Sequence, residues 1–479
     1  MSLIPPALGH PRQLTPPSAQ WALASLALTM LLSSLGTSIA NVALPTLVHA
    51  FDSSFQAVQW VVLAYLLAVT TLVVSVGRLG DLFGRRRLML AGITLFTVAS
   101  IACGLASELW MLVAARAVQG FGGAVMMALT MALVGDAVQE NRAGSAMGFL
   151  GTMSAVGTAL GPSLGGVLIA TLGWRSIFLI NLPLGLAALL LARRYLPADR
   201  EPSSRPSFDY VGSALLAGTL AAYALSMTLG RGHFGALNGA LLCIAFVGAG
   251  IFLAVESRTP SPLLRPELFR NRVISAGFVM SSLVTTVAMT TLVVGPFYLA
   301  GALHLNPAAV GLVMTSGPLV AALTGVPAGR GVDRFGAYRV AVAGLTCMAL
   351  GCFALAVVPI AFGIAGYVVP LVTVTAGFAS FQAANNTAVV SSVQTSQRGV
   401  VSGLLNLARN LGLITGASLM GAVFALASGA ADIASAGVGA VVAGAHVAFA
   451  VAAALVIGAL LIALASSSHA QSTSSTSVG

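Results

Sequence analysis

The stretch Gly77-Arg-Leu-Gly-Asp-Leu-Phe-Gly84 returns later in the chain as Gly329-Arg-Gly-Val-Asp-Arg-Phe-Gly336, so both copies read GRxxDxFG. The two copies lie 252 residues apart, and each falls between two long apolar segments. A second series repeats with an offset of 255 residues: Gly148, Gly157, Gly161 and Gly166 match Gly403, Gly412, Gly416 and Gly421. Two independent motifs with nearly the same offset predict that the chain contains a duplicated unit.

Composition predicts that this unit is built from membrane-spanning helices. Of the 479 residues, 58% are hydrophobic and 7% are charged, whereas soluble domains carry roughly 25% charged residues. About 20 apolar residues in a helix span the hydrocarbon core of a bilayer, and only helices and closed barrels satisfy the backbone hydrogen bonds there. The apolar segments are longer than barrel strands and lack their alternation. We therefore expect an all-α protein that crosses the membrane many times.

Fourteen apolar segments are long enough to be transmembrane helices. They cover residues 21–45, 57–76, 88–107, 110–136, 143–171, 175–195, 208–229, 235–256, 272–300, 307–329, 338–359, 362–390, 399–427 and 441–465. Residues 21–196 and 258–465 would form two six-helix bundles, and residues 197–257 would hold a cytoplasmic linker and two inserted helices. We expect the proline-rich residues 1–20 and the serine-rich residues 466–479 to be disordered cytoplasmic tails.

The distribution of arginine predicts the orientation in the membrane. The chain has a net charge of +10 and contains no lysine. If the N-terminus is cytoplasmic, eighteen of the 22 arginines fall on the cytoplasmic side, and only Arg175 and Arg231 fall on the other, as the positive-inside rule requires. Both termini would then face the cytoplasm from the plasma (inner) membrane. Because these arginines occupy short loops between apolar segments, the positive charge does not indicate nucleic-acid binding.

The GRxxDxFG segments are expected in short cytoplasmic loops, where glycine allows a tight turn. Asp81 could pair with Arg85 or accept hydrogen bonds from backbone amides of the following helix. Such an interaction could act as a latch that holds the two halves together and breaks during transport. A static turn is the alternative. The recurrence of the acid at Asp333 favours the latch. The candidate gating residues are Gly77, Arg78, Asp81, Gly84, Arg85, Arg330 and Asp333.

Two further segments each allow either a functional or a structural interpretation. Arg116 lies inside the segment 110–136, with Gln119 on the same face; a buried arginine is costly and often marks a transport pathway. Bracing backbone carbonyls of a neighbouring helix is the alternative. The segment 143–171 carries small residues and a proline, which predict either a gating seam or ordinary close packing. These residues are Gly157, Gly161, Pro162, Gly165 and Gly166.

Polar residues within the predicted helices 362–390 and 399–427 are candidates for the substrate cavity. Gln382 and Asn386 are spaced i,i+4, and Asn406 and Arg409 are spaced i,i+3, so each pair shares one helix face. Hydrogen bonding between helices is the alternative role for each asparagine.

At these residues the chain resembles the major facilitator superfamily, and specifically its fourteen-helix drug:proton antiporter family. The resemblance covers the chain apart from the tails and rests on several stretches in order: Asn41–Pro45, Gln59–Tyr65, Gly77–Arg87, Arg116–Gly123, Gly157–Gly166, Gly173–Gly185 and Ser402–Arg409. It implies a major facilitator fold and export of hydrophobic compounds by alternating access, in exchange for protons. It assigns Arg116 and Gln119 to a proton or substrate relay, and Asn41 and Tyr65 to the substrate cavity.

One departure from the family pattern concerns the first helix. The family usually has an aspartate where this chain has Gly36, and no carboxylate falls in the middle of the helices that would line the cavity. Proton coupling would then need an unusual carrier, for which Asp136 is the candidate, or a proton brought by the substrate. Because Arg116 and Arg409 would repel a cation at low dielectric, we expect neutral, zwitterionic or anionic substrates.

The sequence therefore predicts a secondary transporter that exports small hydrophobic compounds, such as drugs or toxic metabolites, and works as a monomer in the lipid bilayer. A carrier dedicated to one metabolite, such as an anionic one, is the alternative. The chain has no GxxxxGK[ST], HExxH or GxSxG motif, so we expect neither enzymatic activity nor a cofactor or metal.

Overall fold

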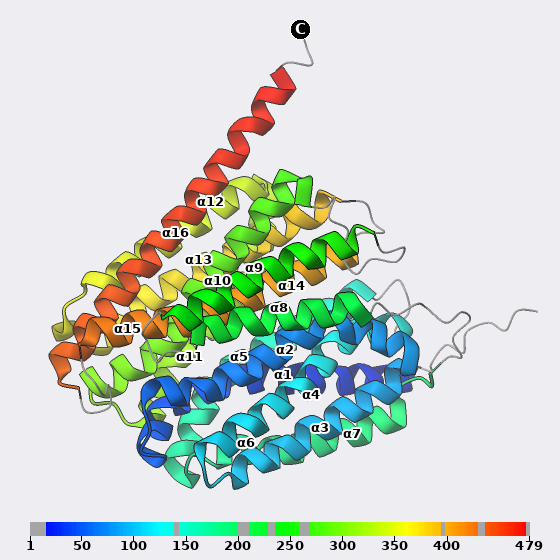
Figure 1. Cartoon of the computed structure of the whole chain (residues 1–479), viewed down its shortest axis with the longest axis horizontal. Coiled ribbons are helices and arrows are strands. Elements are labelled where there is room, and N and C mark those ends of the chain that lie inside the picture. The colour runs from blue at the N-terminus through cyan, green and yellow to red at the C-terminus, as the bar shows by residue number, and fades with distance from the viewer. Residues whose placement is uncertain are drawn as a thin grey trace, which may run out of the picture.

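The computed structural model describes residues 16–137, 143–199, 210–228, 235–258, 269–393, 398–429 and 436–475, and these form helices without a strand. Helices of the first half, coloured blue to teal, lie together in the lower part of Figure 1, and those of the second half lie above them. The first half contains α1 (Pro16–Ala50), α2 (Phe55–Phe83), α3 (Arg85–Leu105), α4 (Leu109–Ala137), α5 (Ala143–Leu172), α6 (Ser176–Leu179) and α7 (Asn181–Tyr195).

The second half contains two π-helices and one 3₁₀-helix in addition to its α-helices. Its elements are α10 (Arg272–Phe297), the π-helix η3 (Tyr298–Ala302), α11 (Pro307–Phe335), α12 (Ala337–Val357), the 3₁₀-helix η4 (Ile360–Phe362), α13 (Gly363–Ser391), α14 (Arg398–Thr415), the π-helix η6 (Gly416–Met420), α15 (Gly421–Ser428) and α16 (Val438–Ser475). Between the halves lie α8 (Tyr210–Thr228) and α9 (Ala236–Glu256).

The same turn joins the first two helices of each half. Asp52 and His304 both have positive φ, 44° and 52°. Two residues later, the side chains of Ser54 and Asn306 cap the next helix by accepting a backbone N–H bond, at 3.3 and 2.8 Å. Such caps satisfy amides that a helix leaves unpaired at its N-terminus. Both pairs lie 252 residues apart, the offset of the GRxxDxFG copies, so the repeat extends to backbone detail.

The described residues contain twelve helices that are long and apolar enough to cross a membrane. Two shorter apolar stretches, 156–172 in α5 and 214–223 in α8, add to these. A multi-pass helical membrane protein is therefore confirmed, whereas the predicted number of fourteen spans remains a prediction.

Several boundaries differ from those predicted, and α1 begins at Pro16, inside the segment 1–20 predicted to be a disordered tail. The GRxxDxFG residues belong to the last turns of α2 and α11, and a single residue, Gly84 or Gly336, separates each from the next helix. The prediction of short loops is wrong here because a glycine with φ of 93° or 84° reverses the chain by itself. The predicted helix 175–195 is divided at Ile180, and α16 continues to Ser475, beyond the predicted end at 465.

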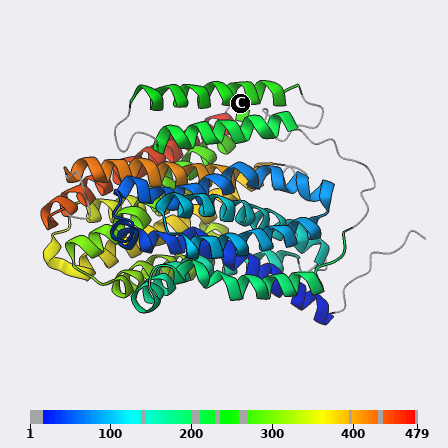
Figure 2. The ribbon, with the colours of Figure 1, turned by 60° about the horizontal axis from the view of Figure 1, so that its bottom comes forward.

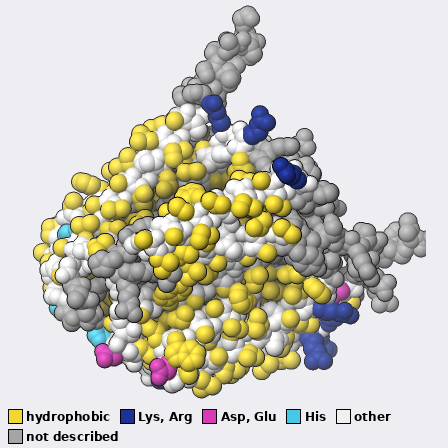
Figure 3. Space-filling view, in the orientation of Figure 1, with side chains coloured by type: hydrophobic (Ala, Val, Ile, Leu, Met, Phe, Trp, Pro, Cys, Tyr) yellow, Lys and Arg dark blue, Asp and Glu magenta, His cyan; other side chains and the backbone are white. Residues whose placement is uncertain are grey.

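The two ends of the bundle differ in charge. We call the end that contains Gly84 and Gly336 the arginine end, and the end that contains Trp174 the Trp174 end. Figure 3 shows arginine side chains at the top and right of the molecule, with an acidic side chain beside them at the right, and further acidic and histidine side chains at the left and lower left. The distribution follows the arginine sorting that the sequence predicts.

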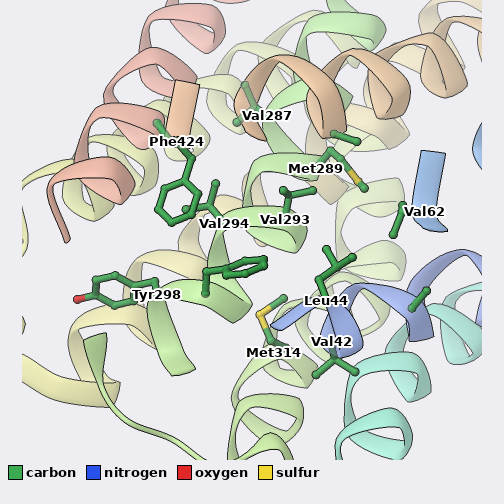
Figure 4. Packing of buried hydrophobic residues seen from close by; sticks show 14 of the residues in the cluster. Val42, Leu44, Val62, Val287, Met289, Val293, Val294, Tyr298, Met314 and Phe424 are labelled. Carbon is green, nitrogen blue, oxygen red and sulfur yellow. The ribbon is translucent and has the colours of Figure 1, made fainter. Parts of the chain in front are cut away.

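Among the described residues, one cluster of buried apolar side chains contains residues of both halves. At the Trp174 end a single cluster contains Leu44 of α1, Val62 of α2, Val293 of α10 and Phe424 of α15, and Figure 4 shows side chains of both halves in contact around Leu44 and Met314. Toward the arginine end, the described residues form one cluster within the first half and another, the apolar cluster of the second half, that also includes residues of α8 and α9. The shared cluster thus joins the halves at the Trp174 end.

The pair α8–α9 lies outside the two halves, as the two stacked green helices of Figure 2 show. Helix α8 packs against α2 of the first half and α14 of the second, and Leu216 and Leu220 belong to the apolar cluster of the second half. The Tyr223 hydroxyl lies 2.5 Å from the Thr415 hydroxyl. The inserted pair therefore covers one seam between the halves.

Glycines allow the central helices to approach closely. A Cβ added at Gly157 or Gly161 of α5 would overlap α1, and a Cβ added at Gly412 of α14 or Gly416 of η6 would overlap α10. The repeated glycines thus make the same contact in each half. In a bilayer, close packing of this kind replaces the hydrophobic effect that drives association in water.

Replacing Gly161 by alanine should therefore lower the thermal stability of the purified protein, by about 1–3 kcal/mol as for other overpacked sites. The new methyl would lie 2.8 Å from the Cβ of Ser38 and 3.0 Å from the amide nitrogen of Ile39, so α1 and α5 would have to separate. Gly250→Ala in α9, where the added Cβ meets nothing within 4 Å, is the control and should be neutral or stabilising. Equal losses would contradict the packing assignment.

Candidate functional site

Arg116 of α4 is completely buried in the first half and is held by three elements. Its Nε donates to the carbonyl of Val61 in α2 at 2.8 Å, and its Nη2 donates to the carbonyl of Gly36 in α1 at 3.0 Å. Its Nη1 donates to Oε1 of Gln119 at 2.5 Å. The planar guanidinium suits this arrangement because its donors diverge in a fixed fork.

Aromatic rings and a second polar contact complete this network. The guanidinium lies 4.3 Å from the ring centroid of Tyr65 and 5.8 Å from that of Phe178, distances at which a cation is attracted to a ring. Tyr65 donates its hydroxyl to the carbonyl of Ser33 at 2.9 Å, and Gln119 donates Nε2 to Ser100 at 2.7 Å. The charge is thus compensated by carbonyl dipoles and rings. No described carboxylate pairs with it.

This geometry favours the structural interpretation of Arg116. A side chain with no exposed surface does not reach a substrate in this conformation, and its donors tie α1, α2 and α4 together. The relay role of Arg116 and Gln119 therefore needs a conformation in which the network opens.

Gly36 is the residue of α1 at which the resemblance predicts an aspartate. Its carbonyl accepts from Arg116, and a Cβ added here would lie 3.2 Å from the Tyr65 hydroxyl and 3.3 Å from the ring of Phe96. These contacts are tighter than ordinary van der Waals contact, so the glycine is accommodated by a pocket with little room for a larger side chain.

The other predicted cavity residues differ in their surroundings. Asn41 is buried in α1, where Nδ2 donates to carbonyls within its own helix and Oδ1 has no described partner. Gln382 of α13 is 8% exposed, and neither amide atom has a described hydrogen-bond partner. Asn386 is half-buried. Gln382 therefore has unused hydrogen-bonding capacity in the apolar interior, which is unusual for a buried polar group.

Helix α14 places Asn406 and Arg409 in different environments. Asn406 is exposed, whereas Arg409 is half-buried and forms no hydrogen bond or ion pair with another described residue. In contrast to Arg116, Arg409 therefore has donors available for an external group.

The gating motif is described in part. Gly77, Arg78 and Asp81 lie in the final turns of α2, but their side chains, like that of Asp136 in α4, fall outside the described part of the structure. Arg85 begins α3, and in the second copy Arg330 and Asp333 are exposed on α11. The proposed pair of Asp81 with Arg85 remains a prediction.

Asp199 contacts this motif, although the sequence did not indicate a role for it. Its carboxylate accepts the backbone N–H of Arg86 at 2.7 Å and that of Arg87 at 3.1 Å, at the N-terminus of α3. A carboxylate at this position pairs unsatisfied amides and the positive end of the helix dipole. A contact between residues 113 apart in sequence leaves no local pattern. The one signal that could have indicated Asp199 is its position as an isolated acid shortly after Arg193 and Arg194.

The glycines of α5 divide between two partners. Gly157, Gly161 and Gly165 face α1 of the same half, whereas Gly166 faces α11 of the other half. A Cβ added at Gly166 would lie 2.9 Å from the Cα of Gly311. Three of these glycines therefore take part in close packing within one half, and Gly166 packs between the halves, whereas the gating role of the segment stays a prediction.

The carboxylate of Asp199 leads to a prediction about the two equivalent turns. Gly84→Ala and Gly336→Ala both put a side chain at positive φ, which costs about 1–2 kcal/mol. Only at Gly84 does the new Cβ also overlap Asp199, since nothing lies within 4 Å at Gly336. Gly84→Ala should therefore lower the melting temperature more than Gly336→Ala, and the excess should vanish in an Asp199→Ala background. Equal losses with Asp199 present would contradict the contact.

Comparisons with known proteins agree with this architecture. The family model described as Major Facilitator Superfamily matches residues 26–417 and 277–478. The riboflavin transporter RibZ of Clostridioides difficile (strain 630) is 30% identical over 82% of this chain and 86% of its own length. The multidrug efflux pump LfrA of Mycolicibacterium smegmatis is 29% identical over 87% of this chain and 83% of its own length.

A solved structure has the same fold. A bacterial homolog of the human lysosomal transporter Spinster, in an inward-facing and unoccupied conformation, superimposes with a TM-score of 0.69 at 16% identity, covering 94% of this chain and 97% of that one. The family match spans most of the chain, and the described helices supply the multi-pass architecture. The protein therefore belongs to the major facilitator superfamily of membrane transporters.

Proposed function

We propose that the protein exports small hydrophobic compounds across the plasma membrane by alternating access. The observation that carries this proposal is that the described residues of the two halves share one apolar cluster at the Trp174 end, whereas neither of the other two described clusters contains residues of both halves. Two rigid halves joined at one end can rock about a central site. The similarity to a multidrug efflux pump supports export.

The charges of the interior support a particular substrate class. The carboxylates with described side chains are Asp52, Glu108, Asp199, Glu256 and Asp333, and all lie at helix ends or in turns. Arg409, by contrast, is half-buried within α14 without a described partner. A lipophilic cation would meet this charge at low dielectric. We therefore propose neutral, zwitterionic or anionic substrates, with Arg409 and Gln382 as the contacting side chains.

The remaining assignments follow from this scheme. Export would be driven by protons, carried by Asp136 or by the substrate itself, since Gly36 replaces the aspartate of the family. The arginine end would face the cytoplasm with both termini, following the positive-inside rule. The protein would function as a monomer of fourteen spans, with bundles 21–196 and 258–465 and the inserted pair in 197–257.

A second candidate function is the transport of one specific metabolite. The similarity to RibZ, named a riboflavin transporter, favours it. An unpaired arginine together with an unpaired glutamine amide would suit a substrate with both an anionic and a hydrogen-bonding group as well as it suits a range of drugs.

A growth-inhibition panel in an efflux-deficient bacterial host tests the proposed function. Cells that express the protein should resist some neutral and anionic antimicrobials, and Arg409→Gln should reduce resistance to anions about tenfold, the effect of one charge-assisted hydrogen bond. Arg339→Gln removes an exposed arginine at the start of α12 and should leave resistance unchanged. All variants are compared at equal membrane level.

Resistance confined to lipophilic cations would contradict the proposed substrate class. If no compound is resisted, general drug export is excluded and transport of a single metabolite remains as the proposed function. Metabolite profiling of expressing cells would then identify that metabolite.

A further inference from the structure

Gln59 of α2 connects the two halves by a side-chain hydrogen bond. It is 5% exposed, and its Nε2 donates to the carbonyl of Ala417 at 2.9 Å, across 358 residues of sequence. Gln59 lies at the Trp174 end, one turn after Phe55, on the face of α2 that meets the second half.

The acceptor belongs to a backbone irregularity. Ala417 lies in the π-helix Gly416–Met420, and such turns interrupt the regular pattern of i→i+4 bonds and are frequent at functional sites. The hydroxyl of the adjacent Ser418 is buried and has no described partner. The carbonyl of Ala417 is thus presented to a donor from the opposite half.

The repeat shows that this contact has an equivalent elsewhere. Gly311 follows Gln59 by 252 residues, and Gly421 follows Gly166 by 255 residues, which are the two offsets of the duplicated motifs. Gly166 packs against Gly311, and Gly421 packs against Gln59, so that a Cβ added at Gly421 would overlap the Gln59 amide. The two seams are therefore copies of one helix crossing.

The two copies differ in chemistry. At Gly166 and Gly311, backbone meets backbone, and no side chain is available to form or break a bond. At the other crossing, the glutamine amide supplies one hydrogen bond beside an aromatic cluster, in which the ring centroids of Phe55 and Phe297 lie 4.7 Å apart and those of Phe55 and Phe424 6.0 Å apart. Such surroundings exclude water and strengthen the bond.

We propose that Gln59 is a positioning residue that holds the Trp174 end of the transporter closed, through a bond that breaks when this end opens. The proposal rests on the proposed function only in that alternating access requires this end to open. Gln59 does not contact substrate in this role. It sets the equilibrium between the closed and open seam, and the glycine crossing is the pivot on the opposite side.

Cysteine labelling tests the latch without a substrate. Leu44, 1% exposed in the shared core, is replaced by cysteine, and the exposed Cys243 and Cys347 are replaced by serine. The rate of modification by a fluorescent maleimide then reports how often the seam opens. Gln59→Leu should raise this rate about fivefold, the population shift expected from loss of a net hydrogen bond.

Two further variants separate the latch from a general loosening of the fold. Asn385→Leu removes an amide of similar burial that donates to the carbonyl of Gly277 at 3.2 Å, within the second half, and should leave the rate unchanged. Gly421→Ala should raise the rate by displacing the Gln59 amide, and should add little when Gln59 is already leucine, since the two changes disrupt one contact.

An unchanged rate in Gln59→Leu, or an equal increase in Asn385→Leu, would overturn the proposal. Because labelling needs no transported compound, failure of the drug panel leaves this result interpretable. If labelling supports the role of Gln59 while the panel shows no resistance, the assignment of the Gln59 contact stands and the proposed substrate class is wrong.

Discussion

Close approach of helix backbones is the constraint on which the structure depends. Lipid offers no hydrophobic drive for helix association, so the helices must gain contact by packing, and they pack closely where one of them presents a glycine. Gly157 and Gly161 satisfy this constraint in the first half, and Gly412 and Gly416 satisfy it in the second. Rigid halves built in this way move as units, which is what a rocking mechanism needs.

Arg116 and Arg409 differ in how the fold compensates their charges. Arg116 is stabilised by carbonyls and rings, and it joins three helices of one half. Arg409 has no such described partners and is half-buried. A buried charge is tolerated only when it is compensated. The fold compensates the charge of Arg116, whereas no described residue compensates that of Arg409, which is why we propose that the substrate contacts it.

Much of the architecture could be predicted from the sequence, because helical spans, arginine sorting and repeated glycines leave local patterns. The two copies of GRxxDxFG predicted the duplication that the turns at Asp52 and His304 display in backbone detail. The contacts of Asp199 and Gln59 could not be predicted, since each joins segments more than a hundred residues apart. The burial of Arg116 by carbonyls was one of two open alternatives, because composition does not reveal which groups a buried charge faces.

The central claim is that the two ends of the bundle open in opposition, with the shared core as one gate. Pulsed electron paramagnetic resonance on two spin-label pairs measures this directly, with one pair at the exposed positions Arg87 and Arg339 of the arginine end and the other at the exposed Leu172 and Ile360 of the Trp174 end. With a transported compound, the distance at the arginine end should shorten while the distance at the Trp174 end lengthens. Changes of the same sign at both ends, or none at either, would contradict the account.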